Sequence, residues 1–222
     1  MSNKVKIKEV FSSIQGEGPF IGYKQVFVRF CGCNLNCNYC DTNFELEGAV
    51  EYSVQDLVET VKSFDKCHSI SLTGGEPLLQ IEFLKEFLPL LNKNVYLETN
   101  ATLGENLAKV IDYIDYISAD IKLPSCSGNS ELWKKHYDFF EIASNKNLFA
   151  KVVFDNKITD EEIERCCDLA KSFNIELVLQ PKMDGEVLKL SSDFLESVLD
   201  KFLQKYSRTR LIPQVHKFLN VR

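Results

Sequence analysis

The sequence has no run of about 18 consecutive apolar residues, the length that a membrane-spanning helix requires. Its first ten residues, MSNKVKIKEV, are polar and lack the apolar core of a secretory signal. Basic residues are not in excess, since the formal net charge is -6. A surface that binds nucleic acid neutralises phosphates with clustered Lys and Arg, so this charge argues against one. We therefore expect a cytoplasmic protein with a small-molecule partner, and neither a membrane nor a nucleic acid as partner.

The chain also lacks internal repeats and low-complexity segments. Its 222 residues, 45% of them hydrophobic, are enough to bury a substantial core. We therefore expect a single domain over residues 1–222. The eight cysteines do not indicate a disulfide scaffold, because the chain is too long for one and four of them lie between Cys31 and Cys40. Metal ligation explains that crowding better.

Short β-rich runs alternate with helical patterns along the chain. Ser53 can cap one helix, and Thr159 with Glu162 forms a capping box at the start of another. Further helices are expected near 81–92, 105–112, 130–144 and 191–206. The strands are expected at 26–30, 69–73, 94–98, 116–121, 148–154 and 175–180. Repeated βα units favour an α/β fold with a parallel sheet, curved into an incomplete (β/α)6-type barrel.

Polar motifs follow the expected strands at their C-terminal ends, where ligands bind in such folds. A cysteine loop follows the first strand, and Thr-Gly-Gly-Glu-Pro at 73–77 follows the second. Residues 98–100 follow the third strand and residues 118–122 lie at the end of the fourth. We expect these motifs to share one site.

The cysteine loop reads FCGCNLNCNYCDT, with the spacing C-x-x-x-C-x-x-C at Cys33, Cys37 and Cys40. A 4Fe-4S cluster held by three thiolates leaves one iron open for a ligand. A structural zinc site is the alternative, with Cys31 as a fourth thiolate, although we interpret Cys31 as a packing residue. The four remaining cysteines are interpreted as buried free thiols: Cys67, Cys126, Cys166 and Cys167.

The cysteine spacing, followed one βα unit later by the glycine motif, resembles the radical S-adenosylmethionine superfamily. The resemblance implies that the open iron chelates the methionine part of S-adenosylmethionine and that Gly74, Gly75 and Glu76 approach its amino group. Tyr39 lies where this superfamily places an aromatic residue against the adenine, although it could equally pack within the loop. Four polar residues at strand ends could also reach this cofactor or simply face solvent: Ser118, Asp120, Lys122 and Gln180.

A second set of segments suggests a substrate pocket. Glutamine and glutamate in SSIQGEGPFIG could pair with an edge that carries amide and guanidine groups, and Arg29 could bind a carboxylate. Taken alone, these residues are better explained as a glycine turn and an ordinary surface arginine. Together with YLETNAT, ISADIKLPS and RLIPQVHKFLNVR, they resemble the 7-carboxy-7-deazaguanine synthase family nearly end to end.

This resemblance implies a carbon-nitrogen lyase that contracts the ring of 6-carboxy-5,6,7,8-tetrahydropterin to 7-carboxy-7-deazaguanine with loss of ammonia, for queuosine or another 7-deazapurine. A 5′-deoxyadenosyl radical would abstract hydrogen from C6, and no side chain would act as a nucleophile. Segment 11–24 would bind substrate, 31–44 would hold the cluster, and 209–222 would close the pocket. The implied substrate residues are Ile14, Gln15, Gly16, Glu17, Arg29, Thr73, His216 and Arg222.

The resemblance also implies Mg²⁺ on Thr42, a reductant such as flavodoxin or ferredoxin, and a homodimer. From the residues alone, Thr42 could cap a turn and His216 could pack near the chain end. Two other functions remain open. A glycyl-radical activating enzyme would use the same cysteine loop on a protein partner, and a zinc-binding interaction module would use it without catalysis.

Overall fold

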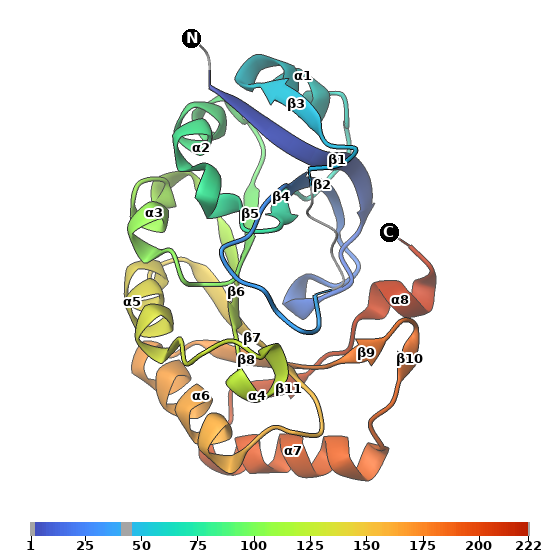
Figure 1. Cartoon of the computed structure of the whole chain (residues 1–222), viewed down its shortest axis with the longest axis vertical. Coiled ribbons are helices and arrows are strands. Elements are labelled where there is room, and N and C mark those ends of the chain that lie inside the picture. The colour runs from blue at the N-terminus through green and yellow to red at the C-terminus, as the bar shows by residue number, and fades with distance from the viewer. Residues whose placement is uncertain (1–2, 41–45, 222) are drawn as a thin grey trace.

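The computed structural model describes residues 3–40 and 46–221, which form a mixed sheet with helices around it (Figure 1). The sheet has nine strands in the order β11-β8-β7-β6-β5-β4-β2-β1-β3. All six predicted strands are present and pair in parallel. They are β2 (Lys24–Phe30), β4 (Ser69–Gly74), β5 (Val95–Thr99), β6 (Tyr116–Ile121), β7 (Asn147–Phe154) and β8 (Glu176–Pro181).

Three further strands extend the sheet beyond the sequence prediction. β11 (Thr209–Leu211) adds in parallel to β8, while β1 (Lys4–Ile14) and β3 (Val50–Ser53) add an antiparallel edge at β2. A separate hairpin joins β9 (Met183–Asp184) to β10 (Val187–Leu188). No pairing joins β3 to β11 in the described ranges, so the barrel is incomplete, as predicted.

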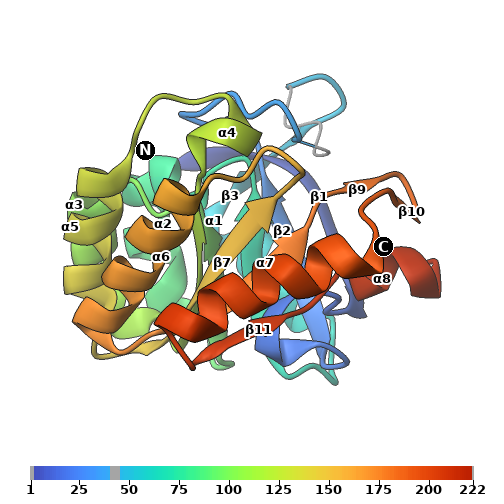
Figure 2. The same cartoon turned by 90° about the horizontal axis from the view of Figure 1, so that it is seen from below.

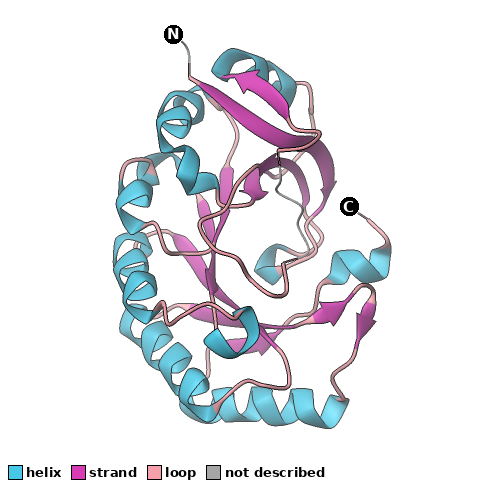
Figure 3. Cartoon of the chain, viewed as in Figure 1, coloured by secondary structure: helices cyan, strands magenta, loops and turns pink. Residues whose placement is uncertain are grey.

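Helices surround the sheet in an arc along its outer side (Figures 1 and 3). Figure 2, seen from below, shows α3, α5 and α6 together on one side of β7. The longer helices are α1 (Val54–Lys62), α2 (Ile81–Phe87), α5 (Trp133–Ala143), α6 (Asp160–Phe173) and α7 (Ser192–Lys205), and the shorter ones are α3 (Gly104–Ala108), α4 (Pro124–Ser127) and α8 (Val215–Leu219). Four 3-10 turns occupy Gly18–Phe20, Pro77–Gln80, Leu88–Leu90 and Ile111–Tyr113.

The predicted helix starts are confirmed at α1 and α6. Ser53 accepts a hydrogen bond from the backbone N–H of Asp56, and Thr159 accepts one from Glu162 in a complete capping box. These bonds satisfy N–H groups that have no partner in the first turn of a helix. None of the helices that the structure describes is both long enough and apolar enough to cross a membrane.

Strand alternation separates the apolar core from a polar barrel interior. On β4, Ile70 and Leu72 pack in the core under the helices, while Ser69 and Ser71 belong to the alternate face and are also fully buried. Aromatic side chains form a second cluster, in which Phe20 and Phe149 pack on Tyr96. The barrel therefore holds polar side chains in its interior, and those near its C-terminal mouth are available to a ligand.

Candidate active site

A cavity of about 1230 Å³ opens at the C-terminal ends of the parallel strands. Its walls come from the cysteine loop, the ends of β4 to β8, the β9-β10 hairpin and α8. The motifs that the sequence placed at strand ends therefore do share one site. Among the candidate residues, the cavity is lined by Ile14, Gln15, Gly16, Glu17, Arg29, Cys33, Cys37, Tyr39, Cys40, Thr73, Gly74, Gly75, Asp120, Lys122, Gln180 and His216.

The cysteine loop leaves the end of β2 and brings three thiols to the cavity wall. Cys33, Cys37 and Cys40 all line the cavity. Cys31 does not: it is 3% exposed, and its backbone N–H donates to the Lys6 carbonyl of β1. The structure thus separates Cys31 from the other three, in agreement with its interpretation as a packing residue.

The two glycines after β4 allow that strand end to touch the cysteine loop. A Cβ on Gly75 would lie 1.8 Å from the Gly32 carbonyl oxygen, and one on Gly74 would lie 2.4 Å from the Phe30 oxygen. Gly74 also has φ +113, in the region that favours glycine. The backbone N–H of Gly75 donates to Phe30 at 3.0 Å. In this structure the glycines therefore fix the base of the cysteine loop, a role that sequence analysis did not anticipate.

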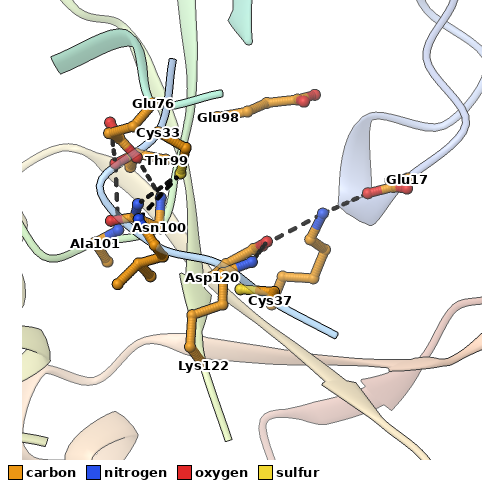
Figure 4. A network of polar contacts seen from close by, with 12 residues as sticks. Glu17, Cys33, Cys37, Glu76, Glu98, Thr99, Asn100, Ala101, Asp120 and Lys122 are labelled. Atoms are coloured by element: carbon orange, nitrogen blue, oxygen red, sulfur yellow. Dashed lines mark hydrogen bonds and ion pairs between the residues drawn. The ribbon is translucent and has the colours of Figure 1, made fainter. Parts of the chain in front are cut away.

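Glu76 lies beneath the cavity wall rather than on it. It is fully buried, and its carboxylate accepts hydrogen bonds from the Thr99 hydroxyl at 2.9 Å and the Asn100 backbone N–H at 2.8 Å (Figure 4). Burial raises the pKa of Glu76 to about 7, against the effect of these bonds. Its side chain therefore holds together the loops that follow β4 and β5.

A chain of buried charges crosses the floor of the cavity. The ammonium of Lys151, on β7, pairs with Glu17 and lies 3.3 Å from Asp120. Asp120 in turn pairs with Lys122 at 2.7 Å. Figure 4 shows Glu17 at one end of this network and Asp120 and Lys122 at the other. Burial is the largest single effect and would raise the pKa of Glu17, but the charge and hydrogen bond of Lys151, together with the hydrogen bond from Gln214, outweigh it and lower that pKa to about 2, so Glu17 is ionised at neutral pH.

A second carboxylate, Glu98 at the end of β5, also faces the cavity. It accepts hydrogen bonds from the Thr73 hydroxyl at 2.7 Å and the Gln15 amide at 2.9 Å. The same Gln15 amide group donates to Gln25, and its oxygen accepts from the Glu17 backbone N–H. The side chain of Gln15 is therefore engaged by the protein, and it positions Glu98.

Arg29 lies on β2 at the side of the cavity. Its Nε donates to Glu9 at 2.8 Å, and its guanidinium lies 5.7 Å from the centre of the Phe11 ring. The side chain is 24% exposed, so part of its surface faces the cavity. This is the only candidate arginine among the described residues that line the cavity.

The C-terminal segment packs directly on the N-terminal one. A Cβ on Gly16 would lie 2.5 Å from the His216 side chain, and the Val215 N–H donates to the Gly16 carbonyl at 2.9 Å. The Gln214 amide donates to Glu17 at 2.7 Å. The two ends of the chain thus build one wall of the cavity.

Comparison with known proteins agrees with this arrangement. The Radical SAM superfamily profile matches residues 27–186. A 7-carboxy-7-deazaguanine synthase from Geobacter sulfurreducens is 37% identical, over 96% of this chain and 96% of its own length. A protein of the same name from Archaeoglobus fulgidus is 35% identical, over 99% of this chain and all of its own.

The chain belongs to the 7-carboxy-7-deazaguanine synthase family. The crystal structure of QueE from Escherichia coli has a similar fold, with a TM-score of 0.67 and 20% identity over 96% of this chain and 95% of that one. A radical S-adenosylmethionine methyltransferase, TsrM from Kitasatospora setae, has a TM-score of 0.50 and 13% identity over 72% of this chain and 34% of that one.

Membership of the radical SAM superfamily implies a 4Fe-4S cluster, and the cysteine loop fits it. Amide N–H groups point at two of the sulfurs, from Asn100 to Cys33 at 3.8 Å and from Asn129 to Cys37 at 3.1 Å. No three His, Cys, Asp or Glu side chains of residues 3–40 and 46–221 converge on one metal ion. A cluster does not need such convergence, because each thiolate binds a different iron.

Membership also implies S-adenosylmethionine, and the cavity beside the cluster loop has groups suited to it. The side-chain oxygen of Gln180 is buried at the cavity wall and has no hydrogen-bond partner among the described residues. Lys122 lies 5.3 Å from the centre of the Tyr39 ring, which places an aromatic face and a charge together. The unpartnered side-chain oxygen of Gln180 is an acceptor that suits an amino group such as that of adenine.

Besides Glu76, three candidate residues of the family site do not line the cavity or lie outside the described residues. Ser118 does not line the cavity: it is 4% exposed and hydrogen-bonds to Tyr96 deeper in the barrel. Thr42 and Arg222 lie outside the described residues. Sequence analysis placed Glu98 in the shared site only as part of the motif at 98–100 and gave it no role. It missed Lys151 and Gln214, because a lysine within a β-strand and a glutamine before a short helix carry no local signal of convergence.

Proposed function

We propose that this chain converts 6-carboxy-5,6,7,8-tetrahydropterin to 7-carboxy-7-deazaguanine by a radical ring contraction with loss of ammonia, in the biosynthesis of queuosine or another 7-deazapurine. The main support is the match to 7-carboxy-7-deazaguanine synthases over nearly the whole length of both chains. A small-molecule cavity with two carboxylates and an arginine, next to three cysteines, supports it further. Neither a protein substrate nor a zinc module is favoured by that match.

The cofactors divide the work with the protein. When bound, the cluster and S-adenosylmethionine supply the 5′-deoxyadenosyl radical, and the chain supplies binding and orientation. Cys33, Cys37 and Cys40 hold the cluster. Gly74 and Gly75 form the wall for the methionine amino group, with Glu76 buried beneath them, while Tyr39, Asp120, Lys122 and Gln180 bind the remaining parts.

The proposed contacts to the substrate follow from the hydrogen-bonding chemistry of the two carboxylates. Carboxylate oxygens accept hydrogen bonds, so Glu17 and Glu98 together match the row of N–H donors on the guanidine-like edge of a pterin. Arg29 is the matching donor for the substrate carboxylate. Gly16, Ile14, Thr73 and His216 complete the walls, and Gln15 acts through Glu98. Lys151 keeps Glu17 charged and in place.

Other parts of this proposal come from the family alone. They are Mg²⁺ on Thr42, a substrate contact from Arg222, a reductant such as flavodoxin or ferredoxin, a homodimer, and a cytoplasmic location. Mg²⁺ prefers oxygen ligands and keeps several waters, so one threonine can suffice as its protein ligand. The division into a substrate segment 11–24, a cluster loop 31–44 and a closing segment 209–222 is supported by the contacts between Gly16 and His216.

The test is an anaerobic assay with product identification. The protein is reconstituted with iron and sulfide, reduced, and given S-adenosylmethionine, Mg²⁺ and 6-carboxytetrahydropterin, and the products are identified by mass spectrometry. Formation of 7-carboxy-7-deazaguanine is expected. Formation of 5′-deoxyadenosine without 7-carboxy-7-deazaguanine would support a radical enzyme but contradict the proposed substrate. A protein that assembles no cluster would instead favour the zinc-binding module.

A further inference from the structure

The loop after α4 contacts the cysteine loop through a side chain that the proposed reaction does not use. The Asn129 amide nitrogen lies 3.1 Å from the sulfur of Cys37, 92 residues earlier in the chain. The contacts at Cys33 are longer, at 3.5 Å from the Leu35 N–H and 3.8 Å from Asn100. Asn129 therefore provides a close amide donor to a proposed cluster ligand.

The backbone around Asn129 is fixed against the same loop. The Asn38 N–H donates to the Ser127 carbonyl at 2.8 Å, next to Cys37. Gly128 has φ +75, and a Cβ there would lie 2.3 Å from the Asn38 side chain. The Asn129 N–H donates to the Ser127 hydroxyl at 3.2 Å. These contacts hold the amide group of Asn129 toward Cys37.

A donor to a cluster thiolate acts on the redox equilibrium. Reduction adds an electron to the cluster, and some of that negative charge resides on the ligand sulfurs. A hydrogen bond to a sulfur stabilises the reduced form more than the oxidised form and so raises the reduction potential. Lys122 also lies near Cys37, but its charge is already paired with Asp120 at 2.7 Å.

We propose that Asn129 raises the reduction potential of the 4Fe-4S cluster through its hydrogen bond to Cys37. The loop after α4 is then a second element that sets how readily the cluster accepts an electron, in addition to the cysteine loop. This inference rests on the assignment of Cys37 as a cluster ligand within the proposed function, and it does not depend on the identity of the substrate.

The experiment is a redox titration of the reconstituted protein, followed by electron paramagnetic resonance, without substrate. The variants are Asn129→Ala, which removes the donor, and Asn129→Asp, which replaces it with a negative charge. Asn147→Ala is the control, because Asn147 is exposed at the start of β7, at the opposite end of the barrel from the cavity. Iron and sulfide contents are measured for each protein.

At the wild-type midpoint potential, we expect the ratio of reduced to oxidised cluster to fall at least threefold in Asn129→Ala and further in Asn129→Asp. A tenfold fall corresponds to about 59 mV for a one-electron couple. The Asn147→Ala variant should keep the wild-type ratio. An unchanged ratio in a fully loaded Asn129→Ala protein would overturn the proposal.

Failure of the Asn129→Ala and Asn129→Asp variants to retain a cluster would overturn it as well, because Asn129 would then be needed for assembly. The product assay on the wild-type protein is separate. A wrong substrate assignment would leave the titration interpretable, and an unchanged potential would leave the proposed reaction standing.

Discussion

Lys151 and Glu17 form a buried ion pair although 134 residues separate them in the chain. Their side chains are 10% and 18% exposed, so water screens the pair only weakly. The same ammonium lies 3.3 Å from Asp120, on the side of the cavity proposed for S-adenosylmethionine. One lysine thus connects the two proposed ligand sites.

Replacement of this lysine should weaken substrate binding. In Lys151→Met, Glu17 loses its cationic partner, and truncating one member of a buried charge pair costs about 2–5 kcal/mol. We therefore expect the KM for the pterin to rise about 30-fold or more, a change that steady-state kinetics with saturating S-adenosylmethionine would measure. Lys151→Arg keeps the charge and should recover part of the loss. Equal pterin KM values in the Met variant and the wild-type protein would show that Lys151 does not position Glu17.

Arg29→Ala should leave the cluster intact and weaken turnover of the pterin. A hydrogen bond to a charged group contributes ~1.5–3 kcal/mol, so we expect the KM for the pterin to rise about tenfold or more. Arg165→Ala is the matched control, because Arg165 is exposed on α6 and remote from the cavity lining. Unchanged turnover of Arg29→Ala at limiting substrate would place Arg29 outside the binding site.

Cys37→Ala should abolish the cluster and all reductive cleavage of S-adenosylmethionine, because one iron loses its thiolate. The iron and sulfide contents and the yield of 5′-deoxyadenosine measure these losses. Cys31→Ala serves as the comparison and should keep both, since Cys31 is buried beside β1. Cleavage that persists in Cys37→Ala would refute the ligand assignment.

His136 should lower the free energy of unfolding of the protein as the pH falls. Its Nε2 accepts from the Lys122 N–H at 3.1 Å, and its Nδ1 lies 3.1 Å from the Ala101 carbonyl, so the ring is neutral with the proton on Nδ1. Burial lowers the pKa of His136 from 6.5 to about 4. The unfolded chain therefore binds the proton first as the pH falls.

The resulting loss of stability lies between pH 6.5 and pH 4. It should reach at most about 1.4 kcal/mol per pH unit. Urea unfolding at pH 7.5 and pH 5, compared between the wild-type protein and His136→Gln, would isolate this contribution. A variant that loses as much stability on acidification as the wild-type protein would contradict it.

Much of the fold could be predicted from local patterns. The six parallel strands carry β-rich runs, and Ser53 and Thr159 mark helix starts by their capping chemistry. β1 was missed although Lys4, Lys6 and Lys8 alternate with the buried Val5 and Ile7, which is a period-two signal. β11 was missed because three residues carry too little pattern to be recognised.

The sequence by itself determined the cysteine spacing, the glycine motif and the order of the βα units, because each is written in neighbouring residues. These features were enough to identify the family and to place the site at the C-terminal edge of the sheet. Only the tertiary structure decided that Lys151 meets Glu17 and Asp120, that Asn129 reaches Cys37, and that Cys31 faces away from the cavity. Such contacts depend on strand order and on the face of the sheet that each side chain occupies, and the curvature of the sheet brings together residues that are far apart in the sequence.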